Sequence, residues 1–495
     1  SLERVIIPKG VTYVGRDIFS GNVKDKLTIF CMGSKEDTKN WNPSWNSSFT
    51  STFKTVYDAG TYESGNVRYT LDVAKMTASA YALAGFGGTF PAEVRYEALS
   101  AQPFAVTGIT YVEEPSLTSL TVPVSVTEIS RGAFAQCQNL QSITLPFAGG
   151  LPELTSDYRD NFDYIFGSGN VPQSLQTVIL TGDAPISEFA FSGCTNLKYL
   201  EIRGNVPEIG NGAFGACVFE SVKVSAQNEY FESVGDKYLL GKDGTLYYSC
   251  DGSLPSSGIT AIAGGAFYYR KDVAAVSVPA GVKYIGANAF CGCSALASIV
   301  LPEGVERIGE NAFAETAYAS NAANKENGVL YIGNYLIRAN SNDFFDPASC
   351  VREGTVLIAD GALKNVNWMS GSESIILPES VRYIGNDAFE SIPGITSVVA
   401  VGAEVIGDRV FLTDNLLYIV LGDGLKEIGE EFFRYFFRGC YFYKGTAQQW
   451  ESVEIAFYNN DTTWLDSQLY FYSESAPQGE GNYWHYVNGE PVQWQ

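Results

Sequence analysis

Apolar residues recur along the chain at a fixed period, in blocks too short to form long helices or long strands. Around Pro302 the sequence reads LASIVLPEGVERIGENAFAET, and a similar stretch surrounds Pro279, 23 residues earlier. Pro123 and Pro146 are separated by the same step. The shared pattern is L-x-x-I-x-L-P-x-x-V-x-x-I-G-x-x-A-F-x-x-C. A period of this length predicts a solenoid, in which each repeat is one coil of a stack.

Each part of the repeat has a physical role. In L-x-x-I-x-L the last two apolar residues are two positions apart, so both face the same side of a short strand. In the copy before Pro146 we expect Ile143 and Leu145 to face the core, and Ser142 and Thr144 to face outward. Proline ends the strand because it has no N–H to donate to the ladder. The segment V-x-x-I-G then supplies two more core residues.

An Ala-Phe pair follows in each repeat, and we expect its ring to fill the interior of the coil. The pair ends at Phe134, Phe191, Phe214, Phe267, Phe290, Phe313 and Phe389. Degenerate copies end at Phe19, Leu363, Phe411 and Phe433. One coil alone cannot bury these residues, whereas stacked neighbours bury them in a continuous core. The predicted fold is therefore a solenoid of short β-strands with few short helical turns.

Interruptions of the period give the expected organisation of the chain. It consists of a first eroded repeat at 1–30, a β-rich excursion at 31–116, the repeat solenoid at 117–439 with insertions near 147–172, 225–258 and 314–355, and an aromatic C-terminal cap at 440–495. Strand-like runs around Asp243-Gly244 and Gly333-Asn334 predict hairpins that project from one edge of the solenoid. Thr446 followed by Gln449 fits a capping box for a short helix.

The repeat unit resembles the BspA-type leucine-rich repeat, which is found in bacterial cell-surface proteins and in some protist surface proteins. The segments LTIFCMGSKEDTKNWNPSWN and YKGTAQQW, and the ending GNYWHYVNGEPVQW, also resemble sequences in such proteins from gut bacteria. The resemblance implies a leucine-rich-repeat solenoid of the α/β-horseshoe type, a right-handed superhelix with inserted hairpins. It also implies display outside the cell, and binding rather than catalysis.

The charge of the chain limits its partners. It carries 32 Lys and Arg against 55 Asp and Glu, for a net charge of −23. A chain this acidic repels phosphate backbones and anionic lipid surfaces, so we expect no nucleic-acid partner and no membrane insertion. No apolar run is long enough to span a membrane, and no signal peptide is visible. We expect a fragment or a mature form whose targeting sequence has been removed.

Catalytic motifs are missing from the sequence. It contains no phosphate-binding loop, no dinucleotide-binding fingerprint following a strand, and no G-x-S-x-G nucleophile elbow. The single histidine, His485, lies between Trp484 and Tyr486, where we expect it to stack in the aromatic cap. We therefore predict no enzyme activity and no cofactor.

Cysteines recur at one position, three residues after the repeat phenylalanine: Cys137, Cys194, Cys217 and Cys293. Other copies place Arg270, Thr316 or Ile392 there, an exchange that a metal site would not tolerate. We interpret the position as a packing site for free, buried thiols. The acidic run Asp157, Asp160 and Asp163 lacks the spacing of a calcium loop and is expected to be solvated.

Tyrosines supply the candidate binding surface. Tyr284 and Tyr383 occupy a position that other copies fill with charged residues, which implies exposure. Tyr199 and Tyr418 are expected to point outward from their strands, with Glu201 beside Tyr199. Exposed tyrosines on a rigid scaffold are typical of protein interfaces and of sugar-stacking platforms.

The sequence thus favours a non-catalytic adhesion protein, secreted or displayed on a bacterial surface and monomeric. It would recognise a host or microbial surface protein along its repeats. The first alternative is a glycan-binding module that uses the exposed tyrosines. The second is an enzyme hidden in the excursion or in the tail.

Overall fold

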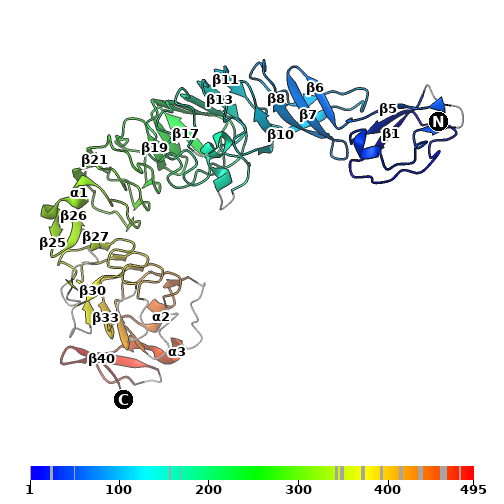
Figure 1. Cartoon of the computed structure of the whole chain (residues 1–495). Helices are drawn as coiled ribbons and strands as arrows, with labels where there is room; N and C mark the ends of the chain where they lie inside the picture. The colour runs from blue at the N-terminus through cyan, green and yellow to red at the C-terminus, as the bar shows by residue number, and fades with distance from the viewer. Residues whose placement is uncertain are drawn as a thin grey trace. The chain divides into compact units, whose positions relative to one another are not determined.

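The computed structural model describes residues 2–22, 26–48, 51–154, 158–167, 169–339, 344–345, 350–368, 374–390, 394–411, 416–432, 439–456, 465–478 and 481–494. The chain divides into two compact units. Unit 1 consists of Ser1–Gly210 and Phe219–Glu232, and unit 2 of Asn211–Val218 and Ser233–Gln495. Strands dominate both units (Figure 1). The α-helices of the described residues are single turns: α1 (Ala317–Ser320), α2 (Ala447–Trp450) and α3 (Leu465–Gln468).

Unit 1 begins with a small parallel sheet formed by β1 (Arg4–Ile7), β2 (Thr28–Cys31) and β5 (Lys54–Val56). A 3-10 turn, η1 (Glu36–Thr38), and the short pair β3 (Ser47–Ser48) and β4 (Ser51–Thr52) lie between these strands in the chain. Trp41 and Trp45 pack edge to face in the core beneath the sheet, with ring centroids 4.8 Å apart. The N-terminal segment therefore has a core of its own.

A second sheet of unit 1 contains β6 (Thr61–Ser64), β7 (Val67–Asp72), β8 (Thr77–Ala82), β10 (Phe104–Val112) and β12 (Glu128–Ile129), with β9 (Glu93–Val94) paired to β10. β7 buries Val67, Tyr69 and Leu71 on one face, as its alternating pattern predicts. β10 pairs in parallel with both β8 and β12. One continuous sheet thus joins the excursion to the first regular coil.

The regular coils of unit 1 form a parallel ladder of β11 (Ser119–Thr121), β13 (Ser142–Leu145), β14 (Thr177–Leu180), β15 (Tyr199–Ile202) and β16 (Ser221–Val224). The expected facing of β13 is confirmed. Ile143 and Leu145 are fully buried, whereas Ser142 and Thr144 are partly exposed on the outer face. Ser142 donates to Ser119 on the neighbouring strand at 3.2 Å.

The insertion at 147–172 continues the aromatic core of unit 1. It contains the 3-10 turns η2 (Tyr158–Asp160) and η3 (Phe162–Phe166). The ring of Phe166 lies 6.0 Å from that of Phe134, and the ring of Phe162 lies 4.8 Å from that of Phe191. The prediction of a solvated acidic run is wrong for Asp160, which is buried because the turn packs inward. Asp157 lies outside the described residues.

Unit 2 repeats the same coil with two rows of short parallel strands. The V-x-x-I-G segments and their degenerate copies form β20 (Ala261–Ile262), β22 (Tyr284–Ile285), β24 (Arg307–Ile308), β29 (Leu357–Ile358), β32 (Tyr383–Ile384), β34 (Val405–Ile406) and β36 (Glu427–Ile428). In the C-terminal segment, β38 (Glu454–Ile455) continues this row by pairing with β36. The L-x-x-I-x-L segments form β21 (Ala275–Ser277), β23 (Ser298–Val300), β31 (Ser374–Ile376), β33 (Ser397–Ala400) and β35 (Tyr418–Leu421). A further pair, β28 (Phe344–Phe345) and β30 (Asn367–Trp368), is also parallel.

Stacked phenylalanines fill the coils. The ring of Phe290 lies parallel to those of Phe267 and Phe313, at centroid distances of 4.8 and 5.4 Å. All seven phenylalanines of the Ala-Phe pairs are buried: Phe134, Phe191, Phe214, Phe267, Phe290, Phe313 and Phe389. Phe433 and Ile392 lie outside the described residues.

The prediction that the hairpins project from an edge is wrong. The first hairpin, β18 (Tyr238–Gly241) and β19 (Thr245–Ser249), buries Leu239 and Leu246, and β19 pairs in parallel with β20. The second, β26 (Val329–Ile332) and β27 (Tyr335–Ala339), pairs through β27 with β29, and β25 (Lys325–Glu326) lies at its outer edge. Both hairpins are built into the solenoid because their apolar residues fill the same core as the repeats. β17 (Phe231–Val234) precedes the first hairpin.

The C-terminal segment extends the sheet. β37 (Cys440–Tyr443), β39 (Leu469–Tyr472) and β40 (Tyr483–Val487) add parallel strands, and β41 (Glu490–Gln493) closes the edge as an antiparallel hairpin. The predicted capping box is confirmed, since Thr446 and Gln449 exchange side-chain to backbone bonds at the start of α2. Trp484 is fully buried against Phe442 and donates its indole N–H to the Tyr443 carbonyl at 3.0 Å.

The cysteines at the repeat position are free and buried, as the sequence predicts. Burial raises the pKa of Cys137, Cys194 and Cys293 to about 12 in each case. Because the thiolate is the reactive form, these thiols are poor nucleophiles near neutral pH.

Candidate functional site

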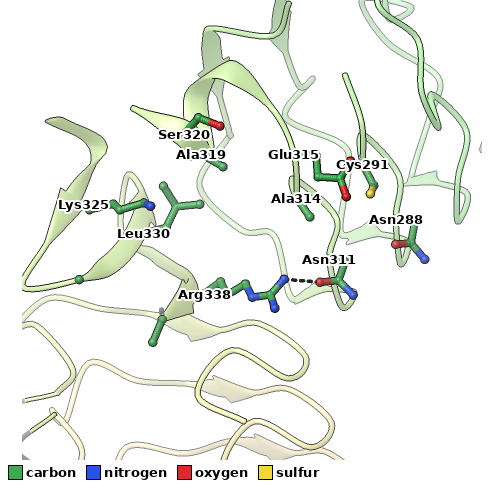
Figure 2. A pocket seen from close by; sticks show the side chains of 12 residues that line it. Asn288, Cys291, Asn311, Ala314, Glu315, Ala319, Ser320, Lys325, Leu330 and Arg338 are labelled. Carbon is green, nitrogen blue, oxygen red and sulfur yellow. Dashed lines mark hydrogen bonds between the residues drawn. The ribbon is translucent and has the colours of Figure 1, made fainter. Parts of the chain in front are cut away.

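A pocket of about 650 Å³ lies in unit 2, where the insertion at 314–355 interrupts the coils. Figure 2 shows Asn311 and Glu315 on the wall made by the last regular coils, with Lys325 on the hairpin across from them. Arg338 reaches from β27 to Asn311, and its Nη1 donates to Asn311 Oδ1 at 2.6 Å. Ser320 of α1 forms the rim. The pocket thus lies between the last regular coil and the second hairpin, whose Ala339 takes the next place in the stack by donating to Ala362.

Backbone conformation explains the asparagines on the coil wall. Asn288 and Asn311 stand two residues before a repeat phenylalanine and have φ values of 57° and 58°. Asparagine tolerates this left-handed conformation better than most residues other than glycine. The left-handed backbone of the turn therefore favours Asn at these two positions. Both side chains line the pocket.

The wall of the pocket that the last regular coils form is the end of a hydrogen-bond ladder. Between the coils carrying Phe290 and Phe313, backbone N–H groups donate to carbonyls of the next coil in three consecutive bonds: Asn288 to Glu310 at 3.0 Å, Phe290 to Ala312 at 2.7 Å and Gly292 to Ala314 at 3.0 Å. We call this row the Ala-Phe ladder. It resumes at the second hairpin, where Ala339 of β27 donates to Ala362 at 2.7 Å, and it continues with Gly361 donating to Asn386 and Leu363 to Ala388.

The equivalent donors of the next coil have no acceptor. Within the described part of the chain, the backbone N–H groups of Asn311, Phe313 and Glu315 find no hydrogen-bond partner. Phe313 is fully buried and lines a second cavity of about 50 Å³, which shares Asn311 and Arg338 with the main pocket. Asn311 is half-buried and Glu315 is exposed, and both line the main pocket. A molecule bound there would supply acceptors to their N–H groups.

The charges at the pocket differ from those of the chain as a whole. Lys325 and Arg338 form no ion pair with any residue that the structure describes. Glu315 lies on the opposite wall and accepts a hydrogen bond from the Tyr269 hydroxyl at 2.9 Å. Burial raises the pKa of Cys291 at the back of the pocket; Glu315 raises it further and Arg338 opposes the shift. The arrangement can bind a group that combines carbonyl acceptors with a negative charge.

A family model described as "BspA type Leucine rich repeat region" matches residues 109–158, 163–235, 257–345 and 354–440, in six copies. These segments make up more than half of the chain. The chain belongs to the BspA-type leucine-rich repeat family. The pocket lies inside the third matched segment, so this BspA-type protein forms it by modifying its own repeats.

Solved structures of low similarity include a leucine-rich cell surface protein from Faecalibacterium prausnitzii, 20% identical over 80% of this chain and 97% of that one, with a TM-score of 0.26. The pneumococcal vaccine antigen PcpA is 17% identical over 81% of this chain and 97% of that one, with a TM-score of 0.35. A leucine-rich repeat protein from Bacteroides ovatus is 17% identical over 83% and 90%, with a TM-score of 0.30. No curated protein matches the chain. At these scores the solved structures carry no conclusion about function.

Tyr199 and Glu201 lie together on the outer face of β15 in unit 1. Tyr199 is 43% exposed, and its hydroxyl donates to Glu220 at 3.0 Å. Glu201 accepts two bonds from Arg203, both at 2.8 Å. Both side chains of this pair are therefore held in one orientation at the surface of the BspA-type repeats.

Tyr284 and Tyr383 lie on the second row of strands in unit 2. Tyr284 is 37% exposed, and the Arg307 guanidinium lies 5.9 Å from its ring centroid. Tyr383 is half-buried rather than exposed as expected, and its pKa is raised first by burial and then by nearby carboxylates. Each tyrosine sits among charged residues but does not contribute to the pocket.

Tyr418 is not an exposed residue, contrary to expectation. Its side chain points outward from β35, but the C-terminal hairpin covers it. Its hydroxyl donates to Glu490 at 3.1 Å, and its ring lies 5.7 Å from that of Phe442. The three tyrosines of unit 2 lie on three different strands, and only Tyr199 and Glu201 share one.

The residues of the pocket were missed by sequence reasoning. A usable signal was present, because the period breaks at 314–355 and the break carries Lys325 and Arg338 in an acidic chain. The unpaired donors at Asn311 and Glu315 left no such signal. Whether they find acceptors depends on where the chain re-enters the stack.

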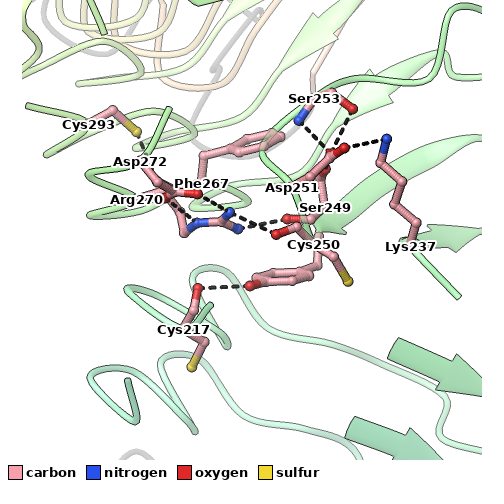
Figure 3. A network of polar contacts seen from close by, with 11 residues as sticks. Cys217, Lys237, Ser249, Cys250, Asp251, Ser253, Phe267, Arg270, Asp272 and Cys293 are labelled. Atoms are coloured by element: carbon pink, nitrogen blue, oxygen red, sulfur yellow. Dashed lines mark hydrogen bonds and ion pairs between the residues drawn. The ribbon is translucent and has the colours of Figure 1, made fainter. Parts of the chain in front are cut away.

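A second polar network in unit 2 surrounds Arg270, which occupies the repeat cysteine position and is almost fully buried (Figure 3). Its guanidinium donates to the carbonyls of Ser249 and Cys250 at 2.7 and 3.1 Å, and to both carboxylate oxygens of Asp272 at 2.8 and 2.7 Å. Tyr248 lies beside it and donates to the Cys217 carbonyl at 2.8 Å. This network ties the first hairpin to the coils and is structural.

The expected stacking of His485 is confirmed. Its ring lies parallel to that of Trp494, with centroids 3.8 Å apart. In the described part of the chain, no group of three or more His, Cys, Asp or Glu side chains is placed to hold a metal ion. Nor does any described helix have the length and apolar character needed to cross a membrane.

Proposed function

We propose that this BspA-type protein is a non-catalytic binding protein, displayed outside the cell, that recognises a protein partner on the surface of its repeats. One observation carries the proposal: the pocket at the interrupted coil combines unpaired backbone donors with two cations that lack ion-pair partners. Groups left unpaired in the free protein gain most when a partner supplies the missing acceptors. Family membership supports the extracellular location and the binding role.

The side chains best suited to catalysis are engaged in packing. His485 is held in a ring stack, and burial raises the pKa of the repeat cysteines. A general base must reach its substrate, and a thiol nucleophile must ionise near neutral pH. These environments favour binding as the activity of the chain.

The outer face of β15, in unit 1, is a separate candidate contact. Tyr199 is exposed, aromatic and already oriented by Glu220, so binding it costs little rotamer entropy. Tyrosine is enriched among residues that carry interface energy. Glu201 beside it is held by Arg203 and supplies a fixed negative charge.

Replacing Ser320 with tryptophan should fill the pocket and abolish binding of the partner, while Tyr199→Ala should weaken it by about tenfold or more. The measurement is biolayer interferometry of the purified chain against a panel of purified host and microbial surface proteins and a glycan array. Both replaced residues are exposed, so the fold should survive.

The matched controls are Ser256→Trp and Tyr230→Ala, which alter exposed residues outside the pocket and outside β15. Neither should change the affinity. If Ser320→Trp and Ser256→Trp bind the partner equally well, the pocket is not the recognition site. Binding to glycans alone, lost on Tyr199→Ala, would favour the glycan-binding alternative.

A further inference from the structure

We propose that the pocket receives an acidic peptide segment of the partner, which docks between the edge of the last regular coil and the second hairpin. Its backbone carbonyls would accept from Asn311 and Glu315, which line the pocket, and a carboxylate of its side chains would pair with Lys325 and Arg338. The inference rests on the proposed function and specifies the chemistry of the ligand.

The arrangement of the donors points to a polypeptide. In the preceding coil, the N–H groups at Asn288, Phe290 and Gly292 meet carbonyls at alternate residues of the next coil. The unpaired donors occur at the same alternate positions, so the complementary group is again a chain with carbonyls at alternate residues. Peptides bind exposed sheet edges by the same logic, with backbone bonds supplying the affinity.

The cations determine the sign of the ligand charge. Lys325 and Arg338 lie across the pocket from the coil edge, and Arg338 keeps donors beyond the one given to Asn311. Glu315 is on the coil wall and is bonded to Tyr269, so a ligand carboxylate is directed to the hairpin side. The net charge of −23 does not prevent this, because exposed charges more than about 8 Å away are largely screened at physiological salt.

The lining favours a peptide over a saccharide. Among the described residues, none that lines the pocket is aromatic, so none of them offers a ring on which a sugar could stack. Leu330 and Ala319 instead provide apolar contacts on the side away from the donors, which suit small side chains of a peptide. A saccharide is therefore the competing occupant that the experiment must test.

The test uses the full chain with a capped peptide of alternating alanine and glutamate, and with its alanine and glutamine counterpart. Calorimetry should show the glutamate peptide binding about tenfold more tightly or better, as expected for hydrogen bonds to a charged group. Amide hydrogen exchange should show new protection at Asn311 and Glu315 on binding. Asn288 and Gly292, whose amides already pair within the ladder, serve as internal controls.

Variants identify the charge contact. The double variant Lys325→Gln/Arg338→Gln should bind the glutamate peptide no better than the wild type binds the glutamine peptide. The double variant Lys9→Gln/Lys54→Gln makes the same change in net charge at exposed residues of unit 1. It should leave the affinity unchanged.

The contrary outcomes distinguish failure of the peptide inference from failure of the proposed binding pocket. If the glutamate peptide binds without protecting Asn311 and Glu315, or fails to bind at millimolar concentration, the inference is overturned. If sialyllactose protects these amides and the peptide does not, the ligand is a saccharide: the inference falls, and the pocket remains a binding site. If neither probe binds and Ser320→Trp affects no partner, the inference and the proposed pocket both fall.

Discussion

Replacing Phe290 with alanine should lower the free energy of unfolding by about 3–5 kcal/mol, the usual cost of truncating a buried aromatic residue. Phe290 is fully buried between Phe267 and Phe313, with both ring pairs stacked within 5.4 Å. Alanine would leave a cavity that rigid neighbouring coils cannot close. Urea unfolding followed by circular dichroism measures the effect.

The control is Tyr13→Ala, which removes a ring that is 64% exposed. That variant should unfold close to the wild-type midpoint, because little apolar surface is lost from the core. An unchanged midpoint for Phe290→Ala would mean that the register assigned to the repeat is incorrect.

Replacing Arg270 with methionine should cost about 3 kcal/mol of stability. The change keeps the apolar stem but leaves the buried Ser249 carbonyl without its donor, and it removes the bidentate bond to Asp272. Buried acceptors that lose a charged donor bear the full desolvation cost. The same urea experiment measures the difference.

Arg203→Met is the matched comparison, because Arg203 also binds a carboxylate through two bonds, to Glu201. Its side chain is 53% exposed, whereas that of Arg270 is 1% exposed. Exposed pairs contribute at most about 1 kcal/mol. Equal losses in the two variants would show that burial does not determine the role of Arg270.

The repeat core could be predicted because each of its positions is set by local rules. A strand alternates, proline ends it, and a ring recurs at one position, so the burial of Phe290 or Ile143 follows from the period alone. The same reasoning placed Arg270 at a packing position. It did not foresee the network, because Asp272 is close in sequence but the acceptors at Ser249 and Cys250 belong to the inserted hairpin.

The pairing of the hairpins and the exposure of the tyrosines are not determined by local sequence rules. An apolar hairpin has the same sequence whether it projects or pairs with β29, and only the partner strand distinguishes the two. Alternation correctly directs Tyr418 outward. It cannot show that Glu490, 72 residues later, lies above it. Surface exposure thus depends on contacts distant in sequence.

The pocket could be predicted only in part, for the same reason. The break in the period marks the insertion, and Lys325 and Arg338 mark its charge. The unpaired donors depend on how the second hairpin packs against the coil before it. That packing becomes visible only once both have been placed in three dimensions.

Amide hydrogen exchange of the free protein tests the central claim most directly, since the interrupted Ala-Phe ladder carries both proposals. We expect the amides of Asn288 and Gly292, which donate to the next coil, to be strongly protected. Those of Asn311 and Glu315, one coil later and without acceptors, should exchange about a hundredfold faster or more. Equal protection at all four positions would mean that the ladder is continuous and that the edge proposed to bind a partner does not exist.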